Sequence, residues 1–203
     1  MDHWPPALST AAPALLLASQ SPRRRAMLAE LGFAFETAAA DIDETPQPQE
    51  SGADFARRMA ETKARTLARP GMTVLAADTD VTLDGVILGK PRDRAHGLDM
   101  LRSLSGRSHH VHSAVAVMHE TVMEVIQTTT QVDMGEIAPA EAEAYWASGE
   151  PADKAGGYAI QGFAARWVRR IDGSISGVIG LPMVETVELL RRFGVTPQPV
   201  AAA

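Results

Sequence analysis

The chain has 203 residues, of which 45% are hydrophobic and 22% are charged, values that exclude a wholly disordered chain and suit one α/β domain. The net charge of -6 argues against bulk electrostatic binding of long nucleic acid, and the absence of cysteine excludes disulfides, thiolate metal sites and a cysteine nucleophile. No stretch has the length of a membrane span or the pattern of a secretion signal, so we expect a cytoplasmic protein with loosely ordered ends at 1–12 and 197–203.

The first predicted elements are a buried strand and a helix. A short apolar run at residues 15–18 indicates the strand. Ser21 and Pro22 then supply a helix cap and a first-turn proline, and Gly32 ends the helix after Leu31. The strand should therefore lead directly into the start of the helix.

Three arginines, at positions 23–25, occupy the first turn of this helix. Cations oppose the helix dipole at that end, where an acidic residue is normally favoured. An anion held by backbone amides, by the hydroxyls of Ser19 and Ser21 and by a guanidinium group would remove the conflict. The alternative is that the arginines turn outward to surface carboxylates, since three successive helical residues cannot all face one ligand.

An acidic, proline-broken loop at 41–49 precedes a second helix. Ser51, with Asp54 three residues later, forms a capping box, and the helix reaches about Ala68. Glu44 in the loop could help to hold a magnesium ion together with substrate phosphate oxygens, or it could be a solvated carboxylate.

Lys63 lies in the apolar row of this second helix. Phe55, Met59, Lys63 and Leu67 are spaced by four residues, so they share one face. A lysine in such a row either extends along the face to solvent or points into a cleft. The spacing alone leaves both interpretations open.

A third apolar run, at 74–77, predicts a covered strand that terminates in Asp78, Thr79 and Asp80, before a hairpin that turns at 84–85. Ligands of open α/β sheets bind beyond the carboxyl ends of strands. Asp78 is therefore the leading candidate for holding a metal or abstracting a proton, and a turn-capping aspartate is the alternative.

Two loops add candidate ligands. Lys90 stands between Gly89 and Pro91, which suits a fixed phosphate contact or an ordinary exposed turn. The glycine-rich stretch at 149–162 contains Gln161, whose amide could match the N–H and carbonyl edge of a pyrimidine. The sequence contains no Ser-His-Asp order, zinc spacing or Walker-type loop.

Strands and helices interleave along the chain, which favours an α/β fold. The remaining predicted elements are helices at 93–104, 139–148 and 182–193, β-rich segments at 111–118 and 122–134, and two short segments, 165–171 and 175–179, around a Gly-Ser turn.

Taken together, these stretches resemble the Maf-like nucleotide pyrophosphatases over nearly the whole chain. The resemblance implies a single domain over 1–203 with an elongated mixed α/β sheet, flanked by helices and divided into two lobes around a cleft, and it implies a homodimer. It is carried, in order, by LASQSPRRRAMLAELG, the DIDE loop, ETKA at 61–64, AADT with LGKPRD, LSGRSHHVHSAVAV, GEPADKAGGYAIQG and GLPMVET at 180–186.

The resemblance also implies a reaction, in which a nucleoside triphosphate is hydrolysed between the α and β phosphates with the help of a divalent metal, Mg or Mn. It assigns the base to Asp78, with Glu44 as its acidic partner at the metal. It assigns phosphate binding to Ser19, Arg23, Arg24, Lys63 and Lys90. In the branch that acts on dTTP and UTP, the specificity positions correspond here to Arg23, Thr79 and Gln161.

Two positions depart from the family pattern. Asp80 replaces an apolar residue and Ile175 an aromatic one, and the second acid leaves open whether Asp78 or Asp80 is the base or whether both touch metal. The resemblance also implies a role for this hydrolysis in clearing non-standard nucleotides and in cell-division arrest. Alternative functions are hydrolysis of 7-methyl-GTP or another modified nucleotide, and non-catalytic nucleotide binding in septum regulation. DNA binding ranks last because the chain is acidic.

Overall fold

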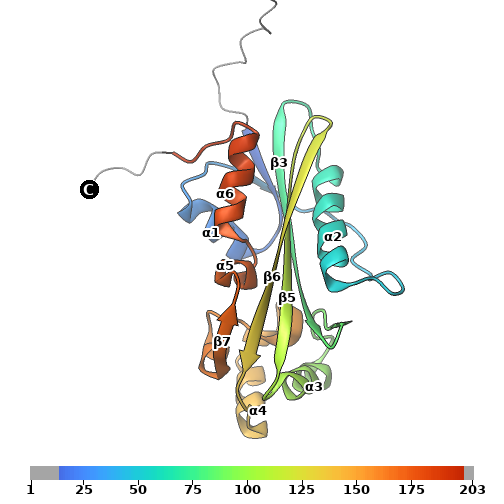
Figure 1. Ribbon diagram of the computed structural model, residues 1–203, viewed down its shortest axis with the longest axis vertical. Helices are drawn as coiled ribbons and strands as arrows, with labels where there is room; N and C mark the ends of the chain where they lie inside the picture. Colours follow the sequence, from blue (N-terminus) through green and yellow to red (C-terminus); the bar gives the residue numbers. More distant parts are fainter. Residues whose placement is uncertain (1–13, 199–203) are drawn as a thin grey trace, which may run out of the picture.

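The computed structural model describes residues 14–198, which build one seven-stranded mixed sheet (Figure 1). Its strand order is β2-β1-β3-β5-β6-β7, and β4 pairs with β3 off this path. The strands are β1 (Ala14–Ala18), β2 (Glu36–Ala38), β3 (Met72–Leu83), β4 (Val86–Ile87), β5 (Ser108–His119), β6 (Val122–Met134) and β7 (Val168–Asp172).

The helices agree closely with the predicted ones, except that residues 175–179, predicted only as a short segment beside a turn, form a helix. The caps at Ser21 and Ser51 are confirmed by hydrogen bonds from the backbone of Arg24 and Asp54. None of the helices formed by residues 14–198 combines the length and apolar character that crossing a membrane requires. The helices are α1 (Pro22–Glu30), α2 (Gly52–Thr66), α3 (Arg94–Leu104), α4 (Pro139–Ala147), α5 (Ile175–Ile179) and α6 (Met183–Arg192), with 3-10 turns at Glu150–Asp153, Ala155–Gly157 and Phe163–Trp167.

The expected loose order at 1–12 lies outside the described residues, as does most of the expected loose segment at 197–203. Gln198, the last described residue, donates its backbone N–H to the carbonyl of Gly32 at 2.8 Å. That bond ties the end of the described chain to the turn after α1.

The long strands β3, β5 and β6 run along the long axis of the molecule (Figure 1). Helix α2 covers one face of this sheet, and α1, α5 and α6 cover the other. Helices α3 and α4 lie with β7 at the far end of the long strands. This arrangement confirms the predicted elongated mixed sheet flanked by helices.

Alternation along β3 assigns its side chains to the two faces. Val74 and Ala76 pack against α2, whereas Leu75 and Ala77 pack in the cluster formed by α1 and α6. Continued alternation turns Asp78 toward α2 and the following threonine toward α1. The candidate residues Asp78 and Thr79 thus lie on opposite faces of β3.

The prediction that the covered strand terminates in Asp78, Thr79 and Asp80 is wrong, because β3 continues to Leu83. Strand β5 pairs with it over its whole polar half, as far as Thr82. On the opposite edge, β1 pairs with β3 only as far as Leu75, and β4 pairs with it only from Thr82. Asp78 and Asp80 therefore lie where this edge of β3 has no partner strand among the described residues. The gap leaves room beside the strand for a ligand, as the end of a strand would.

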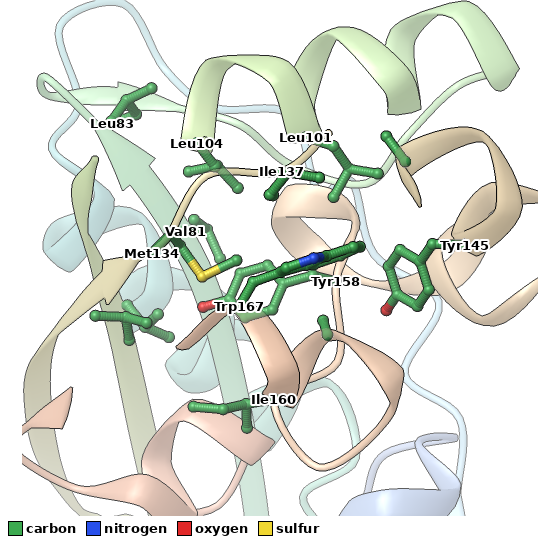
Figure 2. Packing of buried hydrophobic residues seen from close by; sticks show 14 residues of the cluster. Val81, Leu83, Leu101, Leu104, Met134, Ile137, Tyr145, Tyr158, Ile160 and Trp167 are labelled. Carbon is green, nitrogen blue, oxygen red and sulfur yellow. The ribbon is translucent and has the colours of Figure 1, made fainter. Parts of the chain in front are cut away.

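A third hydrophobic cluster holds the glycine-rich segment against the far half of β3 (Figure 2). Val81 of β3, Tyr158 of this segment and Trp167 after it pack there with residues of α3 and α4. Gly156 has φ 70°, and a Cβ atom on it would lie 3.0 Å from Val81. Glycine is required there because the backbone both adopts a left-handed conformation and passes close to β3.

Candidate active site

A cavity of about 870 Å³ opens at the unpaired edge of β3, between the end of β1 and the glycine-rich segment. It is lined by residues from segments that are far apart in the sequence. All of the site residues predicted from the sequence line this one cavity: Ser19, Arg23, Arg24, Glu44, Lys63, Asp78, Thr79, Lys90 and Gln161.

Lys63 forms the centre of an ion-pair network, buried on the side of Asp78 and exposed on the side of Glu44. Its Nζ atom lies 2.6 Å from Oδ1 of Asp78 and 2.7 Å from Oε1 of Glu44. Of the two interpretations of the apolar row on α2, the structure favours the lysine that points into a cleft, since Lys63 is only 8% exposed. Its ammonium group already pairs with two carboxylates, and its predicted contact with phosphate stays a prediction.

Asp80 has different partners from Asp78, although both lie on β3. Burial, and after it the neighbouring Asp78 carboxylate, raises the pKa of Asp80 to about 8. Its Oδ2 atom is buried and has no hydrogen-bond partner among the described residues. The site therefore contains one carboxylate paired with a lysine and one that is largely protonated at neutral pH.

Arg24 joins three segments on the other face of β3. Its Nε donates to the carbonyl of Gly180 at 2.8 Å, and its Nη1 and Nη2 donate to the hydroxyls of Ser19 and Thr79 at 3.4 and 3.3 Å. Thr79 also lies 3.0 Å from the hydroxyl of Ser113. Burial lowers the pKa of Arg24, and the charge of Asp78 opposes this shift. Arg24 thus lines the cavity and also holds Ser19, Thr79 and Gly180 together by hydrogen bonds.

Arg23 reaches across the cavity to the glycine-rich segment. Its Nη1 atom lies 3.5 Å from Oδ2 of Asp153, whose other oxygen accepts a hydrogen bond from Lys154 at 2.6 Å. No local pattern in the sequence indicates a role for Asp153, because its partner lies 130 positions away. Arg23 is thereby directed into the cavity rather than outward.

Lys90, Gln161 and Ser19 complete the predicted set. Lys90 is exposed, and its Nζ lies 3.9 Å from Oε2 of Glu44. Gln161 is exposed and lines the same cavity, and Ser19 accepts from the backbone N–H of Ser21 at 3.2 Å. The cavity therefore has both an exposed cationic group, at Lys90, and an exposed amide, at Gln161.

The oxygen ligands present suit a hard divalent cation that also uses substrate oxygens. Among residues 14–198 no group of three or more histidine, aspartate or glutamate side chains is placed to hold a metal by itself. Magnesium commonly takes one or two protein carboxylates and completes its shell with water and phosphate oxygens. Asp78 and Glu44 supply two such carboxylates, and the unpartnered Oδ2 of Asp80 adds an oxygen nearby, so the residues fit such an ion.

Comparison with known proteins matches residues 14–193 to the family model of the Maf-like protein. The chain is 47% identical over 186 residues to the dTTP/UTP pyrophosphatase of Hahella chejuensis, covering 89% of this chain and 92% of that protein. It is 48% identical over 187 residues to the dTTP/UTP pyrophosphatase of Anaeromyxobacter dehalogenans, covering 90% and 95%.

Among solved structures, a HAM1 protein from Coxiella burnetii matches with a TM-score of 0.41 and 22% identity, covering 60% of this chain and 72% of that one. Similarity of this size says nothing about function.

Proposed function

Because the chain belongs to the family of Maf-like proteins, we propose that it is a nucleoside triphosphate pyrophosphatase that hydrolyses dTTP and UTP. The observation that carries the proposal is the shared cavity, where an acid on β3 faces cations from three other segments. The relatives named above act, by their names, on the same two nucleotides.

The reaction needs a water molecule activated next to the α phosphorus. We assign Asp78 as the group that accepts the proton of this water, because it lines the cavity and is fixed by Lys63. The water oxygen bonds to the α phosphorus as the bond to the bridging oxygen of the β phosphate breaks. The products are a nucleoside monophosphate and pyrophosphate.

The polyphosphate would be bound by the cations that face the cavity. Arg23 and Lys90 have side chains that are 29% and 63% exposed, so their charges can meet the substrate without breaking a buried pair. Their positive charge offsets the charge that develops on the leaving pyrophosphate. Lys63 would hold Asp78 in place and stabilise its carboxylate.

A divalent metal, magnesium or manganese, would be held by Asp78 and Glu44. When bound, it would supply positive charge that polarises the phosphate oxygens. Asp80, two residues along the same strand, would remain the protonated neighbour that limits the negative charge around Asp78.

We assign base selection to Arg23, Thr79 and Gln161. The amide of Gln161 offers one acceptor and two donors, which match the N3–H and carbonyl edge shared by thymine and uracil. We further expect the protein to act on free nucleotides in the cytoplasm, without binding long nucleic acid or a membrane, and as a homodimer.

The test is a substrate panel. Purified protein is incubated with dTTP, UTP, 7-methyl-GTP and ITP in magnesium or manganese, and pyrophosphate and monophosphate are measured. We expect the first two nucleotides to give the highest kcat/KM, with pyrophosphate rather than orthophosphate as the product. Faster hydrolysis of 7-methyl-GTP or ITP would contradict the proposed substrates, and release of orthophosphate alone would contradict the proposed bond.

A further inference from the structure

Two side chains that do not line the cavity lie behind the segment that carries Gln161. Tyr145 on α4 is 1% exposed, and Glu150 starts the first 3-10 turn after it. The Tyr145 hydroxyl donates to Oε1 of Glu150 at 2.8 Å. Neither residue is among those that line the cavity, so neither is expected to touch the substrate.

This pair binds the backbone on both sides of Gln161. The Tyr145 hydroxyl accepts a hydrogen bond from the backbone N–H of Ala159 at 3.0 Å. Oε2 of Glu150 accepts from the backbone N–H of Phe163 at 3.4 Å. Gln161 lies midway between these two anchored residues, so one hydrogen-bonded pair fixes the chain before and after it.

Close packing leaves little freedom in this arrangement. A Cβ atom on Gly162 would lie 2.1 Å from Oε1 of Glu150, so the carboxylate sits directly against the backbone next to Gln161. The ring of Tyr145 stacks on Phe163 with centroids 5.5 Å apart and meets Trp167 edge-on at 5.3 Å. Figure 2 shows the Tyr145 ring beside Trp167 in the cluster that supports the segment.

The exposed side chain of Gln161 depends on this support for its direction. An amide that recognises a base edge must be placed accurately, since hydrogen bonds weaken steeply when their angles deteriorate. Gln161 itself is exposed. The anchoring of its backbone at Ala159 and Phe163 therefore sets where the amide points.

We propose that Tyr145 and Glu150 are positioning residues for base recognition, which act through the backbone on Gln161. This inference rests on the proposed function and extends it, because the base is selected by residues outside the cavity as well as within it. The role is distinct from catalysis, because the hydroxyl and carboxylate of the pair bind each other and the backbone of the segment and form no ion pair with a phosphate-binding cation. Lys154, which lines the cavity, meets only the backbone carbonyl of Glu150, at 2.6 Å.

The first variant is Tyr145→Phe, which removes only the hydroxyl. Because a single hydrogen bond contributes on the order of 1 kcal/mol, we expect kcat/KM for dTTP and UTP to fall about fivefold, through KM, with kcat changed less than about twofold. In a Gln161→Ala background the same change should have no further effect, because the group being positioned is gone. Additive losses, or a loss confined to kcat, would overturn the proposal.

The second pair of variants changes the glutamate. Glu150→Gln keeps one acceptor oxygen and replaces the other with an amide donor, so it can retain only one of the two hydrogen bonds and should raise KM less than Glu150→Ala does. Glu150→Ala should raise KM at least as much as Tyr145→Phe does. The matched control is Thr73→Val, which removes another buried hydroxyl, bonded to His119 at 3.1 Å and remote from the cavity. An equal KM increase in Thr73→Val would assign the effect to general stability and overturn the proposal.

Hydrogen exchange separates this inference from the proposed function. The backbone amides of Ala159 to Phe163 should exchange faster in Tyr145→Phe than in wild type, while those of β3 and β5 stay unchanged. If wild-type protein hydrolyses neither dTTP nor UTP, the proposed function is wrong. The inferred role of Tyr145 and Glu150 in base recognition is then also wrong, even if exchange shows that they hold the backbone at 159–163. If wild type is active and exchange at 159–163 is unchanged, only the inference about Tyr145 and Glu150 is overturned.

Discussion

The Nζ atom of Lys63 lies 2.6 Å from Oδ1 of Asp78, and each residue is only 8% exposed. Two separate patterns produce this contact. The apolar row of α2 turns Lys63 toward the sheet, and the alternation of β3 turns Asp78 toward α2. A buried pair of this kind fixes the carboxylate at the one edge of β3 that is open to the cavity.

Asp78→Asn should abolish hydrolysis while nucleotide binding persists. The amide cannot accept the proton of the attacking water, so we expect kcat to fall about 10³-fold. Arg23 and Lys90 remain in place, and the Kd for dTTP, measured by calorimetry, should therefore change much less than kcat. Asp84→Asn, at the exposed hairpin after β3, is the control and should keep wild-type activity. A variant at position 78 that retains a tenth or so of the activity would exclude Asp78 as the base.

Lys63→Met should destabilise the fold as well as stop the reaction. Removing one member of a buried pair leaves the other charge uncompensated, which typically costs about 3–5 kcal/mol of unfolding free energy. Urea unfolding measures this loss directly. Adding Asp78→Asn to Lys63→Met should restore part of the stability, because the unpaired charge is then removed.

Arg57→Met on the same helix is the matched control for Lys63→Met. Its guanidinium pairs with Glu61 at 2.9 Å, but the side chain is 51% exposed. Exposed pairs contribute little, so we expect a loss of less than about 1 kcal/mol. Equal losses of unfolding free energy in Arg57→Met and Lys63→Met would show that the buried pair of Lys63 and Asp78 stabilises the fold no more than an exposed pair does.

Much of the fold could be predicted from local patterns, because caps and breakers act within a few residues. Ser21 and Ser51 cap their helices, and the left-handed Gly32 follows α1, as the sequence indicates. The end of the third strand could not be predicted in this way. Residues 78–83 continue as strand because β5 pairs with them, and pairing across such a separation leaves no local signal.

The candidate site was predicted as a set of residues but not as a network. Family resemblance brought Arg23 and Arg24 forward together, yet the structure gives them different surroundings. Arg24 donates to Gly180, which lies 156 positions away, and Arg23 meets Asp153 across the cavity. Such partners are determined by tertiary packing, so no spacing rule along the chain could supply them.

Removing divalent metal should stop hydrolysis. We expect a chelator to abolish pyrophosphate release and added magnesium or manganese to restore it. Glu44→Gln should raise the metal concentration for half-maximal activity about tenfold or more, because it removes one proposed carboxylate ligand. Glu61→Gln, a half-buried carboxylate on α2 that pairs with Arg57 and does not line the cavity, is the control, and binding of Mn²⁺ without substrate gives a second readout. Full activity in the chelator would contradict the proposed metal.

His109 makes the stability of the fold depend on pH. It is 1% exposed, its Nε2 lies 2.7 Å from the hydroxyl of Tyr158, and its Nδ1 has no hydrogen-bond partner among the residues described. Burial, and then the charge of His110, lowers the pKa of His109 to about 4, against an opposing contribution from Asp133. The folded protein therefore holds this ring neutral at pH values where the unfolded chain binds a proton.

The sign follows from which state binds the proton. Above about pH 6.5 both states carry a neutral ring, and as the pH falls toward about 4 only the unfolded state is protonated, so His109 destabilises the fold by up to about 3 kcal/mol. Urea unfolding from about pH 7 to about pH 4.5 should give a smaller loss of stability for His109→Gln than for wild type. His110→Gln, at the exposed neighbouring ring, should retain most of the wild-type loss. A His109→Gln profile parallel to wild type would show that this ring does not titrate between the two states.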